Sequence, residues 1–169
     1  QKVTIVFMGE DAALAAAQAG QVDVAYTSAS FSDLALQGYN LAAYPSVDNR
    51  GLTLPAMASE GEKGNDVTAD PAPRKAGHIG IDREAVIEYV LNGHGTPAYS
   101  VCDKMPWFNE AAVVEFDPEG AKALLAEAGW AVGEDGIRQR DGVRAQVNIL
   151  YPASDSVRQA LAAIASNQL

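Results

Sequence analysis

The chain has a single cysteine, Cys102, among its 169 residues, so no disulfide can form within it and multi-cysteine zinc or iron–sulfur sites are excluded. Basic residues are also scarce. The sequence has 12 Lys and Arg against 22 Asp and Glu, a net charge of −10, and only Lys2 is basic before Arg50. Binding to nucleic-acid phosphates or to an anionic membrane surface takes clustered Lys and Arg. The charge therefore argues against both kinds of partner.

Long apolar runs are absent as well. No stretch approaches the ~18 consecutive apolar residues of a membrane-spanning helix. The start, Gln1-Lys2-Val3, has no initiator Met, basic region or cleavage site. We therefore expect neither a membrane span nor an export signal within these residues. With 48% hydrophobic and 20% charged residues, the composition is that of a globular protein long enough for one ordinary domain.

The first part of the sequence predicts a strand–helix–strand unit. Residues 2–8 are mostly β-branched, aromatic and apolar, which is typical of a buried strand, and residues 22–26 have a similar composition. Between these two runs lies an alanine-rich segment that Asp11 can cap and that Gly20 can end in the left-handed conformation. Such units normally have parallel strands, so the prediction is an α/β protein.

Small hydroxyl residues follow the second predicted strand. Thr27 and Ser28 stand at its carboxyl end, and in open α/β sheets ligands bind at that edge. Ser32 or Asp33 can cap a short helix over residues 31–38. No G-x-S-x-G motif is present, so we interpret these hydroxyls as ligand-binding or capping groups and predict no catalytic residue and no enzyme activity.

The rest of the chain alternates helical and extended patterns. The clearest signal is a helix with Asp117 as its cap, Pro118 at its first position and Gly129 as its stop. The final helix begins at Asp155, shows no terminator, and nothing follows to bury its outer face, so we expect the sequence to be cut within a larger protein. The remaining predictions are a strand over 39–44, an extended crossing segment over 46–55, an exposed loop over 59–70, helices over 71–91 that are uneven before Asp82, an irregular aromatic loop over 96–109, a hairpin over 133–142 and a strand over 143–151.

Two sets of residues suggest metal binding but lack the required spacing. His78, His94 and Cys102 form neither His-x₃-His nor Cys-x₂-Cys. Asp135-Gly136 and Asp141-Gly142 lack the frame of a calcium loop and are typical of turns. We therefore predict no metal site and no cofactor.

Two further positions leave alternatives open. Arg50, in the crossing segment, can pair with a ligand carboxylate or with Asp48 or another neighbouring acid. Trp107 and Phe108, next to Pro106, can stack on a ligand or anchor the long aromatic loop in the core.

Four motifs together resemble the family 5 extracellular solute-binding proteins, the peptide, nickel and opine receptors of ATP-driven importers. The most specific is Phe116-Asp117-Pro118-Glu119 through Leu124-Leu125-Ala126-Glu127-Ala128-Gly129-Trp130, followed by Asp135-Gly136-Ile137-Arg138 and Asp141-Gly142. The other three are the run from Ala15 to Ala25, the pair Asp70-Pro71-Ala72-Pro73-Arg74-Lys75-Ala76 and Gly80-Ile81-Asp82-Arg83, and the loop Gly93-His94-Gly95-Thr96-Pro97-Ala98. The sequence departs from the family pattern at Pro73, Gly77 and His78.

The resemblance implies the type II periplasmic-binding-protein-like fold, in which two α/β lobes close around a cleft. It places residues 1–45 at the end of the first lobe, as a strand–helix–strand edge. Residues 46–169 would be the crossing segment and most of the second lobe, truncated at the carboxyl terminus. The matching positions for ligand binding are Thr27, Ser28, Asn49 and Arg50.

The function that the resemblance implies is capture of a small polar ligand, a nickel chelate or an oligopeptide, and its delivery to an ABC permease in the membrane. Residues 65–68 and 99–104 look closer to members associated with nickel than to dipeptide receptors. The resemblance also implies an exported protein, in the periplasm or at the cell surface. The alternative is a sensory or structural solute-binding module that does not take part in transport, and a neighbouring permease gene would favour import.

Overall fold

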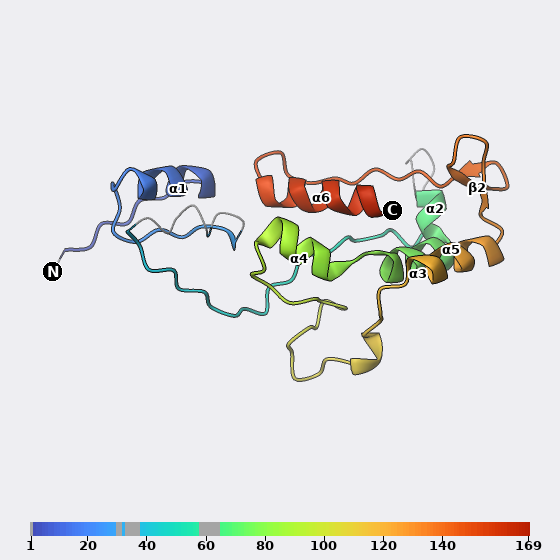
Figure 1. Cartoon of the computed structure of the whole chain (residues 1–169), viewed down its shortest axis with the longest axis horizontal. Helices are drawn as coiled ribbons and strands as arrows, with labels where there is room; N and C mark the ends of the chain where they lie inside the picture. Colours follow the sequence, from blue (N-terminus) through green and yellow to red (C-terminus); the bar gives the residue numbers. More distant parts are fainter. Residues whose placement is uncertain (1, 30–31, 33–37, 58–64) are drawn as a thin grey trace.

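The computed structural model describes residues 2–29, 32, 38–57 and 65–169. Its elements are spread along a long axis, with the amino terminus at one end, α4 and α6 in the middle and the small sheet at the other end (Figure 1). The helices are α1 (Glu10–Gln18), α2 (Asn65–Ala69), α3 (Pro71–Gly80), α4 (Arg83–Leu91), the short 3₁₀ helix η2 (Glu110–Ala112), α5 (Pro118–Glu127) and α6 (Ser156–Gln168). The strands are β1 (Ala131–Val132), β2 (Arg138–Arg140) and β3 (Val143–Arg144).

Helix α3 packs against α5, the most extensive contact between two described elements. Its buried face consists of Ala72, Ala76 and Gly80, which lie four residues apart and so share one side of the helix. A Cβ atom at Gly80 would lie 3.4 Å from the Cβ of Ala121 in α5, so a small residue is required there. The amide of Asp117 also donates to the carbonyl of Ile79 (2.8 Å).

Helix α4 packs against α6 (Figure 1). The Asp82 carboxylate caps α4 by accepting from the Ala85 amide (2.9 Å), and the Asp82 amide donates to the side chain of Gln168 near the end of α6 (3.0 Å). The helix ends at Asn92 in the left-handed conformation, with a φ of 50°. Local capping and one long-range bond therefore fix the position of α4.

The sheet is antiparallel, in the order β1-β2-β3. Ala131 pairs with Gln139 and Arg140 pairs with Val143. The predicted hairpin is therefore confirmed, and the caps Asp117 and Asp155 are confirmed as well. Gly129, with a φ of 84°, follows α5 as predicted.

The strand–helix–strand prediction is wrong in both of its strands. Residues 2–8 and 22–26 form no strand, and Phe7 is 94% exposed where we predicted burial. A strand needs a neighbour for its backbone amides and carbonyls, and no described segment pairs with either run. Helix α1 does form between them, two residues earlier than predicted, because Gly9 and not Asp11 is its N-cap. Gly20, with a φ of 67°, follows it as expected.

Other predictions for the regular elements also need correction. The strand over 39–44 is absent, and the strand over 143–151 is reduced to Val143–Arg144. Helix α2 occupies part of the predicted exposed loop, whose residues 59–64 lie outside the described residues. Helix α3 is regular from Pro71 because the amides of the first turn have no helical partner in any case, so Pro73 costs nothing there. Of the short helix over 31–38, only Ser32 and Gly38 are described.

Candidate ligand-binding groove

One large open groove of about 2200 Å³ runs between the amino-terminal part of the chain and the sides of α3, α4 and α6. It is larger than the 300–1,000 Å³ of an ordinary small-molecule pocket. All four predicted ligand-binding residues, Thr27, Ser28, Asn49 and Arg50, line it. Two of these positions precede the crossing segment and two lie within it.

The Asn49 side chain is engaged in a structural contact. It is half-buried, and its Nδ2 donates to the carbonyl of Val101 in the aromatic loop (3.2 Å). This bond ties the crossing segment to residues 52 positions later in the chain. A ligand that contacts Asn49 can still use its Oδ1 as an acceptor and the second N–H of Nδ2 as a donor.

Arg50 is exposed, and among the described residues it forms no ion pair with Asp48 or with any other acid. The positive charge of Arg50 acts electrostatically on Asp155, the cap of α6. The pKa of the Asp155 carboxyl is lowered chiefly by the bond from the Arg158 amide. Burial opposes this shift, and the Arg158 guanidinium and Arg50 add to it. Among the described residues the pairing with Asp48 is therefore not formed, and Arg50 lines the groove.

Arg83 is a groove residue that the sequence did not single out. Its Nε donates to the carbonyl of Ala98 (3.0 Å), its Nη2 lies 3.0 Å from Nδ1 of His78, and its guanidinium lies 4.9 Å from the centre of the Tyr99 ring. Burial lowers the pKa of Arg83, and the coupling to Tyr99 opposes that shift. Arg83 therefore fixes the start of the aromatic loop against α4.

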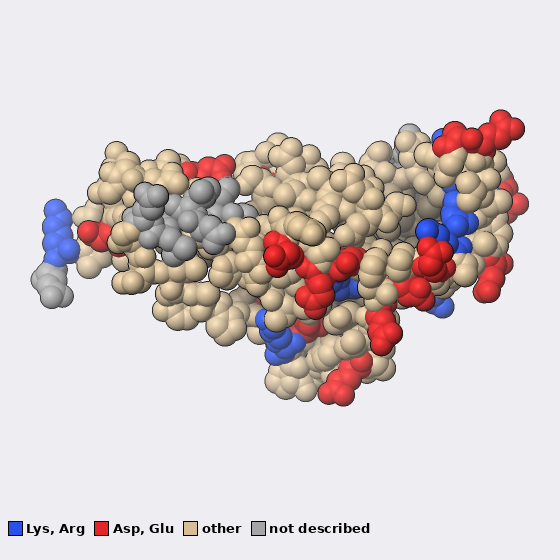
Figure 2. Space-filling view, viewed as in Figure 1, with Lys and Arg blue, Asp and Glu red and all other residues tan. Residues whose placement is uncertain are grey.

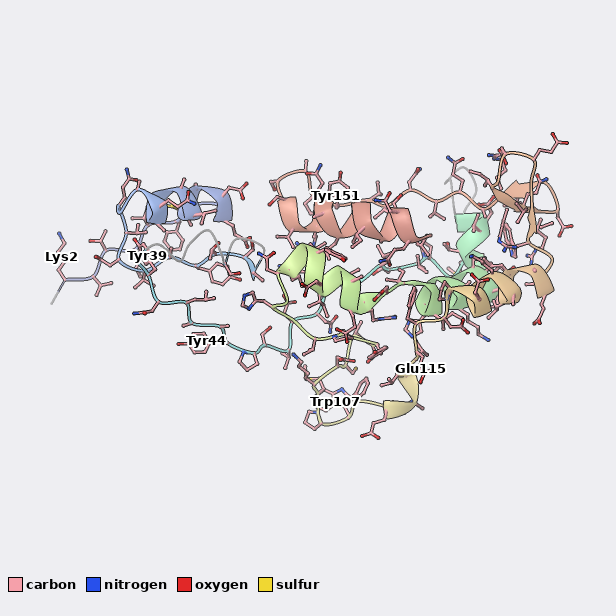
Figure 3. All side chains as sticks on the ribbon, viewed as in Figure 1. Lys2, Tyr39, Tyr44, Trp107, Glu115 and Tyr151 are labelled. Carbon is pink, nitrogen blue, oxygen red and sulfur yellow. The ribbon has the colours of Figure 1, made fainter. Side chains whose placement is uncertain are left out.

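The aromatic loop leaves Trp107 away from the groove. Trp107 is 69% exposed and does not line it, and Figure 3 shows it on a loop that projects from the body of the molecule. The prediction that Trp107 anchors the loop in the core is wrong. Phe108 is half-buried.

Within the residues that the structure describes, no three His, Cys, Asp or Glu side chains gather as they would around a metal ion. His78 and His94 both line the groove, and Cys102 is a half-buried free thiol. None of the described helices has the length and apolar character that a bilayer crossing requires.

The family model for the bacterial extracellular solute-binding proteins, family 5, middle region, matches residues 1–169. The chain belongs to this family. Membership in family 5 implies the type II periplasmic-binding fold, with which these helices and the small sheet are compatible. Membership in a family of solute-binding proteins supports a solute-binding role for this chain.

Three curated proteins are similar to this family 5 chain. Protein XP55 of Streptomyces lividans is 40% identical over 117 residues, which cover 68% of the chain and 20% of XP55. The oligopeptide-binding protein AppA of Bacillus subtilis is 30% identical over 110 residues, which cover 62% of the chain and 20% of AppA. Heme-binding protein A of Haemophilus influenzae is 40% identical over 62 residues, which cover 36% of the chain and 11% of that protein. The chain thus spans about a fifth of the length of the first two relatives.

Proposed function

We propose that these residues are part of the substrate-binding component of an ABC importer, which captures a short peptide between two lobes and delivers it to a membrane permease. The observation that carries this proposal is the convergence of Thr27, Ser28, Asn49 and Arg50 on one groove. The similarity to an oligopeptide-binding protein favours a peptide as the ligand over a nickel chelate.

The arrangement of the elements supports a two-lobed architecture. Helix α1 lies at one end of the molecule and α3 to α6 lie toward the other, with the crossing segment between them (Figure 1). In our proposal, residues 1–45 belong to the end of the first lobe and residues 46–169 to the crossing segment and most of the second. The groove between these two parts is then one section of the cleft that closes on the ligand.

The chemistry of the groove suits a peptide. Arg50 offers an always-charged donor for a carboxylate, the side-chain oxygen of Asn49 can accept from an amide, and apolar residues such as Leu41 and Val47 line the same space. Such a site combines apolar surface with a few placed polar groups, as ligand sites generally do.

The binding step is tested on the full-length polypeptide that carries these residues. Equilibrium dialysis against a library of tripeptides to pentapeptides, read by mass spectrometry, should enrich particular peptides, and nickel(II)–histidine should not compete with them. X-ray scattering should show a smaller radius of gyration with saturating peptide. Binding of the nickel chelate alone would contradict the peptide assignment.

The delivery step and the exported location need a separate test. Deletion of the gene should abolish uptake of a labelled peptide selected from that library, and fractionation should recover the protein outside the cytoplasm. If the purified protein binds the peptide but the deletion strain still takes it up fully, the sensory or structural alternative is favoured instead.

A further inference from the structure

Two buried hydroxyl groups beside the groove have no hydrogen-bond partner among the described residues. They are Thr27 Oγ1 and Ser32 Oγ. Ser32 is only 2% exposed; the helix that the sequence predicts it to cap lies largely outside the described residues. Buried hydroxyls are nearly always paired, since an unpaired one carries an unrecovered desolvation cost. Two such groups in one short segment therefore indicate a partner that binds there.

The fold holds the two residues on the same wall of the groove. The amide of Ser32 donates to the carbonyl of Ala29 (3.1 Å), which holds Ser32 close to the residue two positions after Thr27. Both residues line the groove, together with the buried α1 residues Leu14 and Ala17. Figure 3 shows the nearby Tyr39 beside α1, and its hydroxyl already donates to the carbonyl of Val22. It is therefore not the missing partner.

The charge around this wall selects the kind of ligand group. Between Lys2 and Arg50 the sequence has no basic residue. On the face seen in Figure 2, blue surface at the amino-terminal end is confined to the tip. The acidic residues Glu10 and Asp23 line the groove on this side. A carboxylate or phosphate would meet only repulsion here, whereas an uncharged group would not.

We propose that Thr27 and Ser32 form a subsite for an uncharged amide of the ligand. An amide presents one carbonyl that needs a donor and one N–H that needs an acceptor, and a hydroxyl can serve either role. The inference rests on the proposed peptide-binding function and adds a charge-free subsite to the groove that Arg50 also lines.

The test uses the full-length polypeptide and three probes: acetyl-trialanine amide, which is uncharged, maltotriose, which offers only hydroxyl groups, and tricarballylate, which offers only carboxylates. Calorimetry should show binding of the peptide amide alone. The isosteric change Thr27→Val and the change Ser32→Ala should each weaken that binding about tenfold, the equivalent of one hydrogen bond. Thr27→Ser should restore most of the affinity that Thr27→Val loses.

Matched controls are Thr53→Val and Ser166→Ala, at exposed positions that do not line the groove, and both should leave affinity unchanged. The melting temperature without ligand should stay equal or rise in Thr27→Val and Ser32→Ala, because each removes an unpaired buried polar group. A fall in melting temperature would show that the hydroxyls have structural partners, and would overturn the inference.

Three other outcomes also overturn it. If Thr27→Val and Ser32→Ala bind the peptide amide as the wild type does, the subsite is wrong while the proposed function stands. If the wild type binds maltotriose or tricarballylate instead, the ligand group is wrong. If the wild type binds none of the three probes, the inference fails, and the library dialysis described above decides the proposed function separately.

Discussion

The Asp70 carboxylate should be the most costly single side chain to remove from the helical core. One of its oxygens accepts from the Ala72 amide at the start of α3 (2.8 Å). The other accepts from Nε1 of Trp130 (2.9 Å) and pairs with Arg140. Trp130 is 1% exposed, and the Arg140 guanidinium lies 4.9 Å from the centre of its ring. The carboxylate therefore joins α3, the end of α5 and β2.

The magnitude follows from these three contacts. Asp70→Ala removes a helix cap, at a cost of about 1 kcal/mol. It also leaves the indole N–H of Trp130 buried and unpaired, at a cost of roughly 1–3 kcal/mol. The Arg140 side chain is 36% exposed, so its ion pair adds at most about 1 kcal/mol. The expected loss in the free energy of unfolding is about 2–5 kcal/mol, a large part of the stability of an ordinary domain.

Urea unfolding checks this value, with Trp130 fluorescence as the probe in a Trp107→Phe background, since Trp107 is 69% exposed. Asp117→Ala is the matched control. Asp117 caps α5 through the Gly120 amide (2.8 Å) from an exposed position, so its loss should cost only about 1 kcal/mol. If Asp70→Ala destabilises the protein no more than Asp117→Ala does, the buried Trp130 contact does not contribute as described.

Three further perturbations test other parts of the fold. Gly80→Val should lower stability by about 1–3 kcal/mol in a thermal melt, because a Cβ there already lies 3.4 Å from Ala121; tolerance of Val would contradict the close α3–α5 contact. Gly120→Ala places a Cβ 2.1 Å from an Asp117 oxygen and so should displace the cap. In urea titrations, the double variant Asp117→Ala/Gly120→Ala should therefore be no less stable than Asp117→Ala alone. Additive losses of stability in the double variant would refute this explanation. The pKa of Asp70 is lowered because bonds from Ala72, Trp130 and Arg140 outweigh burial, which acts to raise it. The stability that the Asp70 charge contributes is therefore complete above about pH 4 and should disappear as the pH falls through the lowered pKa. Asp70→Asn should accordingly destabilise the protein less at low pH than at neutral pH. An equal loss of stability at both pH values would contradict this.

The elements that the sequence predicts well are those fixed by local bonds. The predicted caps Asp117 and Asp155 each accept a hydrogen bond from the amide of the third residue of the helix that follows, and such short-range signals are legible in the sequence. Strands depend on partners elsewhere. Residues 2–8 carry the composition of a buried strand, but composition does not say which segment pairs with them, and none of the described residues does.

In the candidate site, too, the sequence indicates which residues are involved but not the contacts that depend on distant segments. The resemblance to family 5 selected Thr27, Ser28, Asn49 and Arg50, and all of them line one groove. The sequence did not indicate that Asn49 bonds to Val101 or that Arg83 stacks on Tyr99, because these contacts depend on how distant segments pack. Nor does a run of small polar residues reveal which hydroxyl lacks a partner.

Binding of a peptide in the groove is the central claim, and calorimetry on paired proteins tests it most directly. The full-length polypeptide and its Arg50→Ala variant would be titrated with the peptide that library dialysis enriches most. We expect micromolar or tighter binding by the wild type, loss of about tenfold or more in the variant, and weak or no binding by residues 1–169 alone. Equal affinity in the wild type and the Arg50→Ala variant, or micromolar binding by residues 1–169 alone, would contradict the account.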